Sequence, residues 1–145
     1  MSSERAFWNL LDEKLSPFGI LHRIENRVGT GTPDVAYCLR RRPKGPITSG
    51  WLELKQTEWP SRSGTPFTIE SLTLNQVQFL ERWSKNGGMA FLLAQVDHDY
   101  LLWHPQKIRP ILNRTYTSAE AIAAASLYWR SPWPRAKILD HLTRT

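Results

Sequence analysis

The sequence contains a single cysteine, Cys38, among its 145 residues. A lone cysteine excludes an intramolecular disulfide framework and a zinc site built from several cysteines, and it favours a reducing compartment. No run of about 18 consecutive apolar residues occurs, which excludes a typical membrane-spanning helix. The first residues, Met1 to Arg5, lack the charged and apolar regions of a secretory signal peptide. We therefore expect a soluble protein that stays in the cytoplasm.

Acidic residues are also few relative to basic ones. The chain has 13 Asp and Glu against 19 Lys and Arg, so its formal charge is +6 and its pI is near 9.8. This balance favours a polyanionic partner such as DNA, although ribosomal and membrane-surface proteins can be equally basic. His22, His104 and His141 show no metal-ligand spacing. The hydrophobic content of 41% and the length predict one globular domain, residues 1–145, with a substantial buried core.

Two short segments place acidic residues where a pair of strands brings them together. Asp34 opens a strand-like run over residues 34–39, directly after a Gly-Thr-Gly-Thr-Pro segment that cannot be helical. Residues 51–55 read as a second strand, whose period of two sends Glu53 and Lys55 to one face and Leu54 to the other. If the two runs form a hairpin, Asp34 lies beside Glu53.

These residue types suit a hard divalent cation. Two carboxylates about 5 Å apart repel by about 3 kcal/mol at an effective dielectric constant of about 20, and a bound cation removes that repulsion. Asp34 and Glu53 are therefore candidate ligands for Mg²⁺ or Mn²⁺, with the Leu54 carbonyl as a third. Lys55 is placed to orient an attacking water or to stabilise charge on a phosphoryl group. The alternative is a surface hairpin with a solvated glutamate and lysine, because short motifs often occur by chance.

The order of these motifs resembles that of the PD-(D/E)xK nuclease superfamily. The likeness is to its small VRR-NUC and Holliday-junction-resolvase-like branch, often found in phages, and it spans residues 3–103. The residues that carry it are Glu25, Gly31-Thr32-Pro33-Asp34, Glu53-Leu54-Lys55, Leu74-x-Gln76, Trp83 and Gly87-Gly88. The resemblance implies a restriction-endonuclease-like α/β fold. It also implies a bacterial or phage-infected host cell as the cytoplasmic setting.

The resemblance further implies an activity. It points to a Mg²⁺- or Mn²⁺-dependent DNA endonuclease that hydrolyses phosphodiester bonds, with branched or junction DNA as a candidate substrate and a homodimer as a candidate assembly. Asp34 and Glu53 then bind metal and Lys55 is catalytic. Two alternatives stay open: a noncatalytic nucleic-acid-binding protein on the same fold, and a structural partner in a nucleoprotein assembly.

Two more site residues follow from the resemblance alone. It implies an additional acidic ligand from the N-terminal part, for which Glu25 and Glu4 are candidates. Glu25 is favoured because only a short loop separates it from Asp34, whereas Glu4 also suits the positive end of a first helix. Gln76 is implied to position water or phosphate, although it also fits a polar helix surface.

The pattern along the chain predicts an αβββαβ core with a central mixed sheet. A helix from Ser3 carries Phe7, Trp8, Leu11 and Leu15 and ends before Pro17. Strands are expected over 20–25, 34–39, 51–55, 89–96 and 100–103, with a polar turn at 97–99. A second helix begins at Thr73, with an apolar stripe of Leu74, Val77, Leu80 and Trp83 that ends at Gly87-Gly88.

The remaining segments are basic, irregular or helical. The loop that carries Arg40, Arg41, Arg42 and Lys44 is a candidate phosphate clamp or a solvated turn. Residues 56–72 are expected to form an irregular loop that suits a substrate flap, and Arg62 in this loop is a further candidate nucleic-acid contact. The extension over 108–145 is expected to be helical at 118–128 and 134–142. Its Trp129, Arg130, Trp133 and Arg135 either stack on bases or pack the tail against the sheet, and we favour packing. Cys38 is expected in the core.

Overall fold

The computed structural model describes residues 4–24 and 31–143. Its first six main elements follow the predicted αβββαβ order, which is thereby confirmed. In chain order the elements are α1 (Glu4–Leu15), the 3₁₀ turn η1 (Ser16–Phe18), β1 (Gly19–Arg23), β2 (Val35–Arg40), β3 (Ile47–Thr57), α2 (Leu74–Lys85), β4 (Met89–Val96), β5 (Asp99–Trp103), the 3₁₀ turn η2 (Pro105–Lys107), α3 (Arg109–Leu112), α4 (Ser118–Ala124), β6 (Leu127–Trp129) and α5 (Arg135–Leu142).

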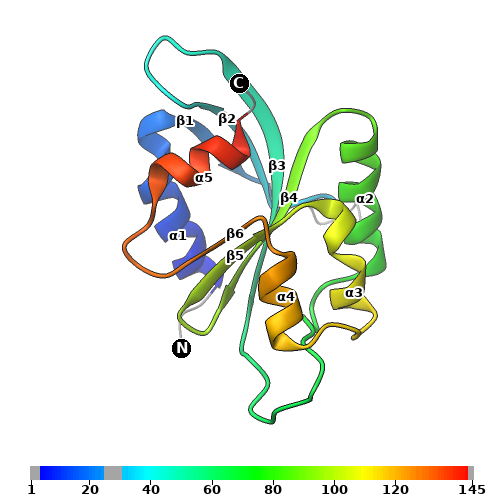
Figure 1. The fold of residues 1–145 in the computed structure, drawn as a ribbon. Helices are drawn as coiled ribbons and strands as arrows, with labels where there is room; N and C mark the ends of the chain where they lie inside the picture. Colours follow the sequence, from blue (N-terminus) through cyan, green and yellow to red (C-terminus); the bar gives the residue numbers. More distant parts are fainter. Residues whose placement is uncertain (1–3, 25–30, 144–145) are drawn as a thin grey trace.

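One mixed sheet forms the centre of the molecule. Its strands are arranged in the order β1-β2-β3-β4-β5-β6, and only β3 and β4 among these neighbours run parallel. A parallel pair needs a long crossover connection, and α2 lies within that connection. Helices α1 and α5 cover one face of the sheet, and α2, α3 and α4 cover the other (Figure 1). The central strand β4 is therefore buried on both faces, as its apolar run predicts.

The two helices of the αβββαβ core bury the residues that their spacing selects. Phe7, Leu11 and Leu15 of α1 recur every four residues and are fully buried, which matches one face of a helix. In α2 the predicted stripe is only half correct, since Leu74 is 46% and Trp83 is 42% exposed. Each step of three residues rotates a helix by about 300°, so the ends of a strict three-residue series lie on opposite sides. Only the middle residues of the stripe, Val77 and Leu80, reach the core.

The segment over residues 56–72 differs from the irregular loop predicted for it. Its first two residues continue β3 to Thr57. Phe67 and Ile69 are buried between the sheet and the C-terminal helices, and the Phe67 N–H donates to the Tyr116 carbonyl at 2.8 Å. Regular spacing is absent here because these apolar residues fill single gaps rather than one continuous face. The tip around Arg62 is exposed, as are Glu58, Glu70 and Ser71.

The C-terminal extension contains a strand that the sequence analysis assigned to a helix. The Ala-rich helix α4 ends at Ala124, and the chain then pairs with β5 as β6. Ser126 directs this change because its N–H and its hydroxyl both donate to the Leu102 carbonyl, at 2.8 and 3.0 Å. Trp129 and Trp133 are buried and pack against Tyr100. The extension is thus anchored by packing, as favoured above.

Asp99, in the predicted polar turn, ties three segments together. Its carboxylate accepts hydrogen bonds from the Trp59 indole at 2.7 Å, the Tyr128 hydroxyl at 2.8 Å and the Arg130 guanidinium at 2.5 Å. Burial alone would raise the pKa of Asp99, but these donors outweigh it and lower the pKa below its ordinary value. Within residues 4–24 and 31–143, no cluster of three metal-ligating side chains is found, and no helix there has the length and apolar character needed to cross a membrane.

Cys38 is exposed, so its expected place in the core is wrong. Tyr37 and Leu39 are buried in the layer beneath α1, and the strand period sends Cys38 to the opposite face. That face is open to solvent over β1 and β2, where Ile20, the partner of Cys38, is 68% exposed. A small apolar residue in a strand indicates a core position only if a helix covers its face.

Candidate functional site

The β2–β3 hairpin brings Asp34 and Glu53 together. Its register ends with Val35 opposite Leu52. The next pair in this register is Asp34 opposite Glu53, whose side chains lie on the same side of the sheet. The Asp34 carboxylate lies close enough to Glu53 to raise the pKa of Glu53. Asp34 is also held by the backbone, because its Oδ2 accepts the Leu54 N–H at 3.0 Å.

The segment before Asp34 has little conformational freedom. Gly31 has a φ of +91°, and a Cβ there would lie 2.7 Å from the backbone oxygen of Asn75 at the start of α2, so a side chain would be strained on both counts. The Asp34 carbonyl accepts the Ile24 N–H at 2.6 Å. The Asp34 carboxylate is therefore placed by contacts with both the sheet and α2.

Glu53 is buried, and one of its oxygens lacks a partner. The residue is 1% exposed, and its Oε1 has no hydrogen-bond partner among the described residues. The Lys55 Nζ lies 3.8 Å from Glu53 Oε2 and donates to the Ser71 carbonyl at 2.8 Å. Burial, followed by the hydrogen bond and charge of the neighbouring Asp34, raises the pKa of Glu53 to about 10, although Lys55 acts to lower it. Without a cation, Glu53 therefore keeps a proton at neutral pH.

A divalent cation fits this arrangement. An orphaned buried oxygen costs free energy, and a hard cation supplies the missing partner while neutralising two adjacent carboxylates. The Leu54 N–H points toward Asp34. Because an extended residue directs its N–H and its carbonyl to the same strand edge, the Leu54 carbonyl lies on that side as well. Asp34, Glu53 and the Leu54 carbonyl are thus the oxygen donors that could hold a cation such as Mg²⁺ or Mn²⁺.

The structure describes one of the two candidates for the additional acid. Glu25 lies outside the described residues. Glu4, in the first turn of α1, has its Oε1 3.9 Å from Arg23 NH2. The charge of Glu4 also contributes to raising the pKa of Glu53, as the weakest of the causes that act on it. Glu4 is therefore within electrostatic range of the carboxylate pair.

Gln76 caps its own helix. Its Oε1 accepts the Thr73 N–H at 2.9 Å, and its own N–H donates to Thr73 Oγ1 at 3.2 Å. This reciprocal capping box can be read from the Thr-x-x-Gln pattern at residues 73–76. The Ser71 carbonyl that accepts from Lys55 carries no comparable sequence signal, since any residue supplies a carbonyl.

The basic loop between β2 and β3 is exposed over most of its length. Arg41 Nε lies 2.5 Å from Asp140 Oδ1 of α5, in an ion pair whose side chains are both exposed. Lys44 has a φ of +65° at the turn. Arg40 is half-buried, whereas Arg42 and, at a separate site, Arg62 are exposed. The loop cations lie on a different strand end from Asp34 and Glu53.

Comparison with known proteins shows a likeness to solved structures. No protein-family model and no curated protein matches the chain. Among solved structures, the chain is similar to Hjc, a Holliday junction resolvase from the archaeal hyperthermophile Archaeoglobus fulgidus. The two are 17% identical, the TM-score is 0.47, and the match covers 72% of this chain and 78% of that one. The αβββαβ order and the six-stranded mixed sheet are consistent with the restriction-endonuclease-like fold expected from the sequence.

Proposed function

We propose that the protein is a metal-dependent endonuclease of the PD-(D/E)xK type that hydrolyses phosphodiester bonds in DNA. The observation that carries this proposal is the pairing of Asp34 with Glu53, whose Oε1 is buried without a hydrogen-bond partner among the described residues. A carboxyl group that serves only the fold is rarely buried in this way. The basic charge of the chain supports a nucleic-acid substrate.

Each residue of the site has a separate task. Bound Mg²⁺ or Mn²⁺ would supply Lewis-acid stabilisation of the charge on the scissile phosphate. Asp34, Glu53 and the Leu54 carbonyl hold the cation, and the Leu54 N–H keeps the Asp34 carboxylate in position. The Lys55 ammonium, fixed by the Ser71 carbonyl, orients the attacking water or stabilises negative charge that develops on the phosphate. The capping contacts use the Gln76 Oε1 and backbone N–H, so its proposed role in positioning water or phosphate falls to the side-chain NH₂.

A cleavage panel tests the activity directly. Branched, flapped, nicked, linear and single-stranded DNAs are incubated with Mg²⁺, with Mn²⁺ and with EDTA. Cleavage of any of them that requires the metal supports the proposal, and preference for a junction would make the enzyme structure-specific. Binding without cleavage under all metal conditions would instead support the noncatalytic alternative. Sedimentation of the same protein decides whether it forms the proposed homodimer.

The identity of the additional acid can be decided by comparing two variants. The chain position of Glu25 favours it as a ligand, so Glu25→Gln is expected to impair metal binding and cleavage more than Glu4→Gln. Glu4 acts on Glu53 through its charge, and its loss should have the smaller effect, within about tenfold. Calorimetric titration of Mn²⁺ into each variant provides the measurement. The opposite ranking would assign the acidic ligand to α1.

The basic loop is expected to contribute to DNA affinity through phosphate contacts. Four contacts, from Arg40, Arg41, Arg42 and Lys44, would add about −3.6 to the log–log salt slope on duplex DNA. The exposed Arg41–Asp140 pair is weak enough to exchange for a phosphate. Replacing all four with Ser should flatten the slope by that amount in fluorescence-anisotropy titrations.

A matched control removes cations elsewhere. Lys107, Arg114 and Lys137 are exposed, and replacing them with Ser lowers the net charge without touching the loop. If this control flattens the salt slope as much per charge as the loop variant does, the loop is a solvated turn and not a clamp.

A further inference from the structure

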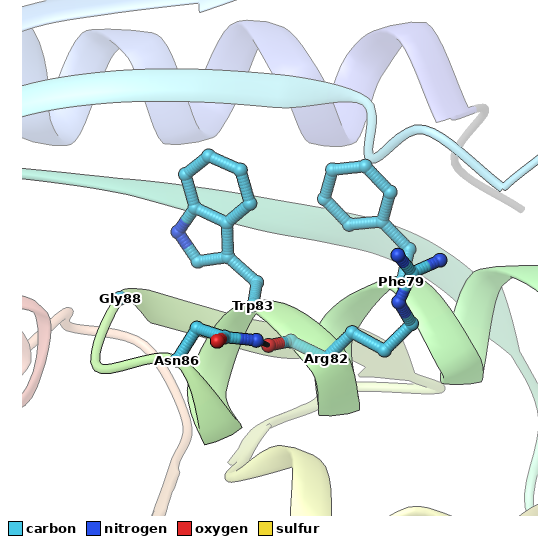
Figure 2. A pocket seen from close by; sticks show the side chains of 5 residues that line it. All are labelled: Phe79, Arg82, Trp83, Asn86 and Gly88. Atoms are coloured by element: carbon cyan, nitrogen blue, oxygen red, sulfur yellow. Dashed lines mark hydrogen bonds between the residues drawn. The ribbon is translucent and has the colours of Figure 1, made fainter.

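Three aromatic rings cluster on the sheet face that carries the candidate site. Phe79 and Trp83 of α2 are stacked, with ring centroids 5.7 Å apart and an interplanar angle of 8°. Trp51 of β3 meets both rings edge-on, at 5.7 and 5.8 Å. Figure 2 shows Phe79 and Trp83 projecting from the same side of α2. Together with Arg82, Asn86 and Gly88 they line a cavity of about 500 Å³.

The ring of Trp83 is held in place although much of it is exposed. The residue is 42% exposed, and a Cβ on Gly88 would lie 2.2 Å from its Nε1. Only glycine therefore leaves room for the ring in this orientation. An exposed aromatic ring in a fixed orientation is a ready contact surface for a planar ligand.

This cavity is connected to the candidate site through α2. Trp51 lies on the same face of β3 as Glu53, two residues away, which places their Cα atoms about 7 Å apart. Asn75, Phe79 and Trp83 recur every four residues and so line one side of the helix. Asn75 contacts Gly31, in the segment that leads to Asp34. One side of α2 thus extends from the segment that leads to Asp34 to the aromatic cluster.

The surroundings of the cavity favour a nucleic acid as its occupant. Arg82 and Lys85 are basic residues in the last turn of α2, and both are exposed. A second copy of the chain bound through the same surface would bring a second pair of these cations into the interface, because a two-fold interface uses the same patch on both copies. A DNA strand instead brings phosphates to the cations and bases to the rings.

We infer that the Phe79–Trp83 cavity is a stacking platform for an unpaired DNA base next to the cleavage site. This inference rests on the proposed function, since it names the part of the DNA substrate that α2 recognises. Trp83 stacks on the base and Arg82 contacts the adjoining backbone. The platform selects DNA that has unpaired nucleotides, which a fully paired duplex does not offer. Stacking on an aromatic side chain does not depend on base identity.

Binding in EDTA tests the platform without cleavage. Anisotropy titrations compare a short single strand, the same strand with abasic sites, and the corresponding duplex. Trp83→Ala is expected to weaken single-strand binding about tenfold and duplex binding less than about twofold. Wild-type protein should lose a similar factor on the abasic strand, whereas Trp83→Phe should retain most of the affinity. Leu74→Ala, which removes a comparably exposed side chain from the same helix, should change neither.

Several outcomes would overturn the inference. Equal loss on single strand and duplex would mean that Trp83 supports the fold or a general DNA contact, and unchanged affinity would mean that it contacts no base. If sedimentation shows that Trp83→Ala and Trp83→Phe both dissociate a dimer without altering strand affinity, the surface joins two copies. The binding test in EDTA is independent of the cleavage panel. If the protein cleaves no DNA in that panel but still binds single strands through Trp83, the hydrolytic function is wrong and the stacking platform is supported.

Discussion

Replacing Asp34 by Asn, or Glu53 by Gln, is expected to reduce metal-dependent DNA cleavage about a thousandfold. Each substitution removes the charge of an oxygen donor and changes the side-chain volume little. The fold should survive, because the Leu54 N–H can donate to an amide oxygen as it does to Asp34 Oδ2, and because Glu53 is protonated in the metal-free protein. Initial rates under excess Mg²⁺ and Mn²⁺ provide the measurement, and circular dichroism checks the fold.

Two further variants sharpen this test. Glu13→Gln removes an exposed carboxylate from α1 and should cleave at the wild-type rate. Lys55→Ala should lower turnover while metal affinity is kept, because Lys55 Nζ donates to the Ser71 carbonyl and is no ligand. Wild-type rates in Asp34→Asn or Glu53→Gln would remove both residues from the site. Loss of metal binding in Lys55→Ala would mean that the lysine organises the donor set.

Metal affinity is expected to rise about tenfold for each pH unit between pH 7 and 9, because one proton must leave Glu53 when the cation binds. The pKa of Glu53 in the metal-free protein is raised to about 10 by burial and by Asp34. Calorimetry of Mn²⁺ binding in buffers with different ionisation enthalpies counts the released proton directly. Affinity independent of pH over this range, with no proton released, would show that Glu53 is already ionised.

The same carboxyl group makes the stability of the metal-free protein pH-dependent. In the unfolded chain Glu53 titrates near its ordinary pKa of 4.5, whereas in the folded chain it titrates near 10. The ionisation of Glu53 therefore leaves the free energy of unfolding unchanged below about pH 4.5. As the pH rises from there toward 10, it lowers that free energy by on the order of a few kcal/mol in total. Glu53→Gln cannot ionise, so denaturant titrations of this variant should show a weaker decline across that interval.

The sequence predicts the αβββαβ core and the Asp34–Glu53 pair because both depend on local patterns. The alternation at residues 51–55 determines which side chains share a face with Glu53, and the turn residues between β2 and β3 bring Asp34 opposite. The exposure of Cys38 depends instead on which face of the sheet a distant helix covers, and no neighbouring residue carries that information.

Strand β6 likewise cannot be predicted from its own residues. Leu127 and Tyr128 follow an Ala-rich helix, and their helical spacing is no worse than that of the residues before them. They form a strand because β5, a distant segment, presents an unpaired edge to them. Lys55 illustrates the effect within the site, since its position depends on a backbone carbonyl at Ser71 that any residue type supplies.

The edge position of β6 also determines how the molecule avoids unwanted association. Without β6, strand β5 would expose a row of backbone donors and acceptors to other chains, which is the arrangement that promotes aggregation. Tyr128 and Arg130 donate to Asp99 of β5 and so fix β6 at this edge, and Asp99 also accepts a hydrogen bond from Trp59 in the loop that follows β3. The C-terminal residues thus cover the edge of β5, and the hydrogen bonds of Asp99 that fix them there also fix one end of the loop after β3.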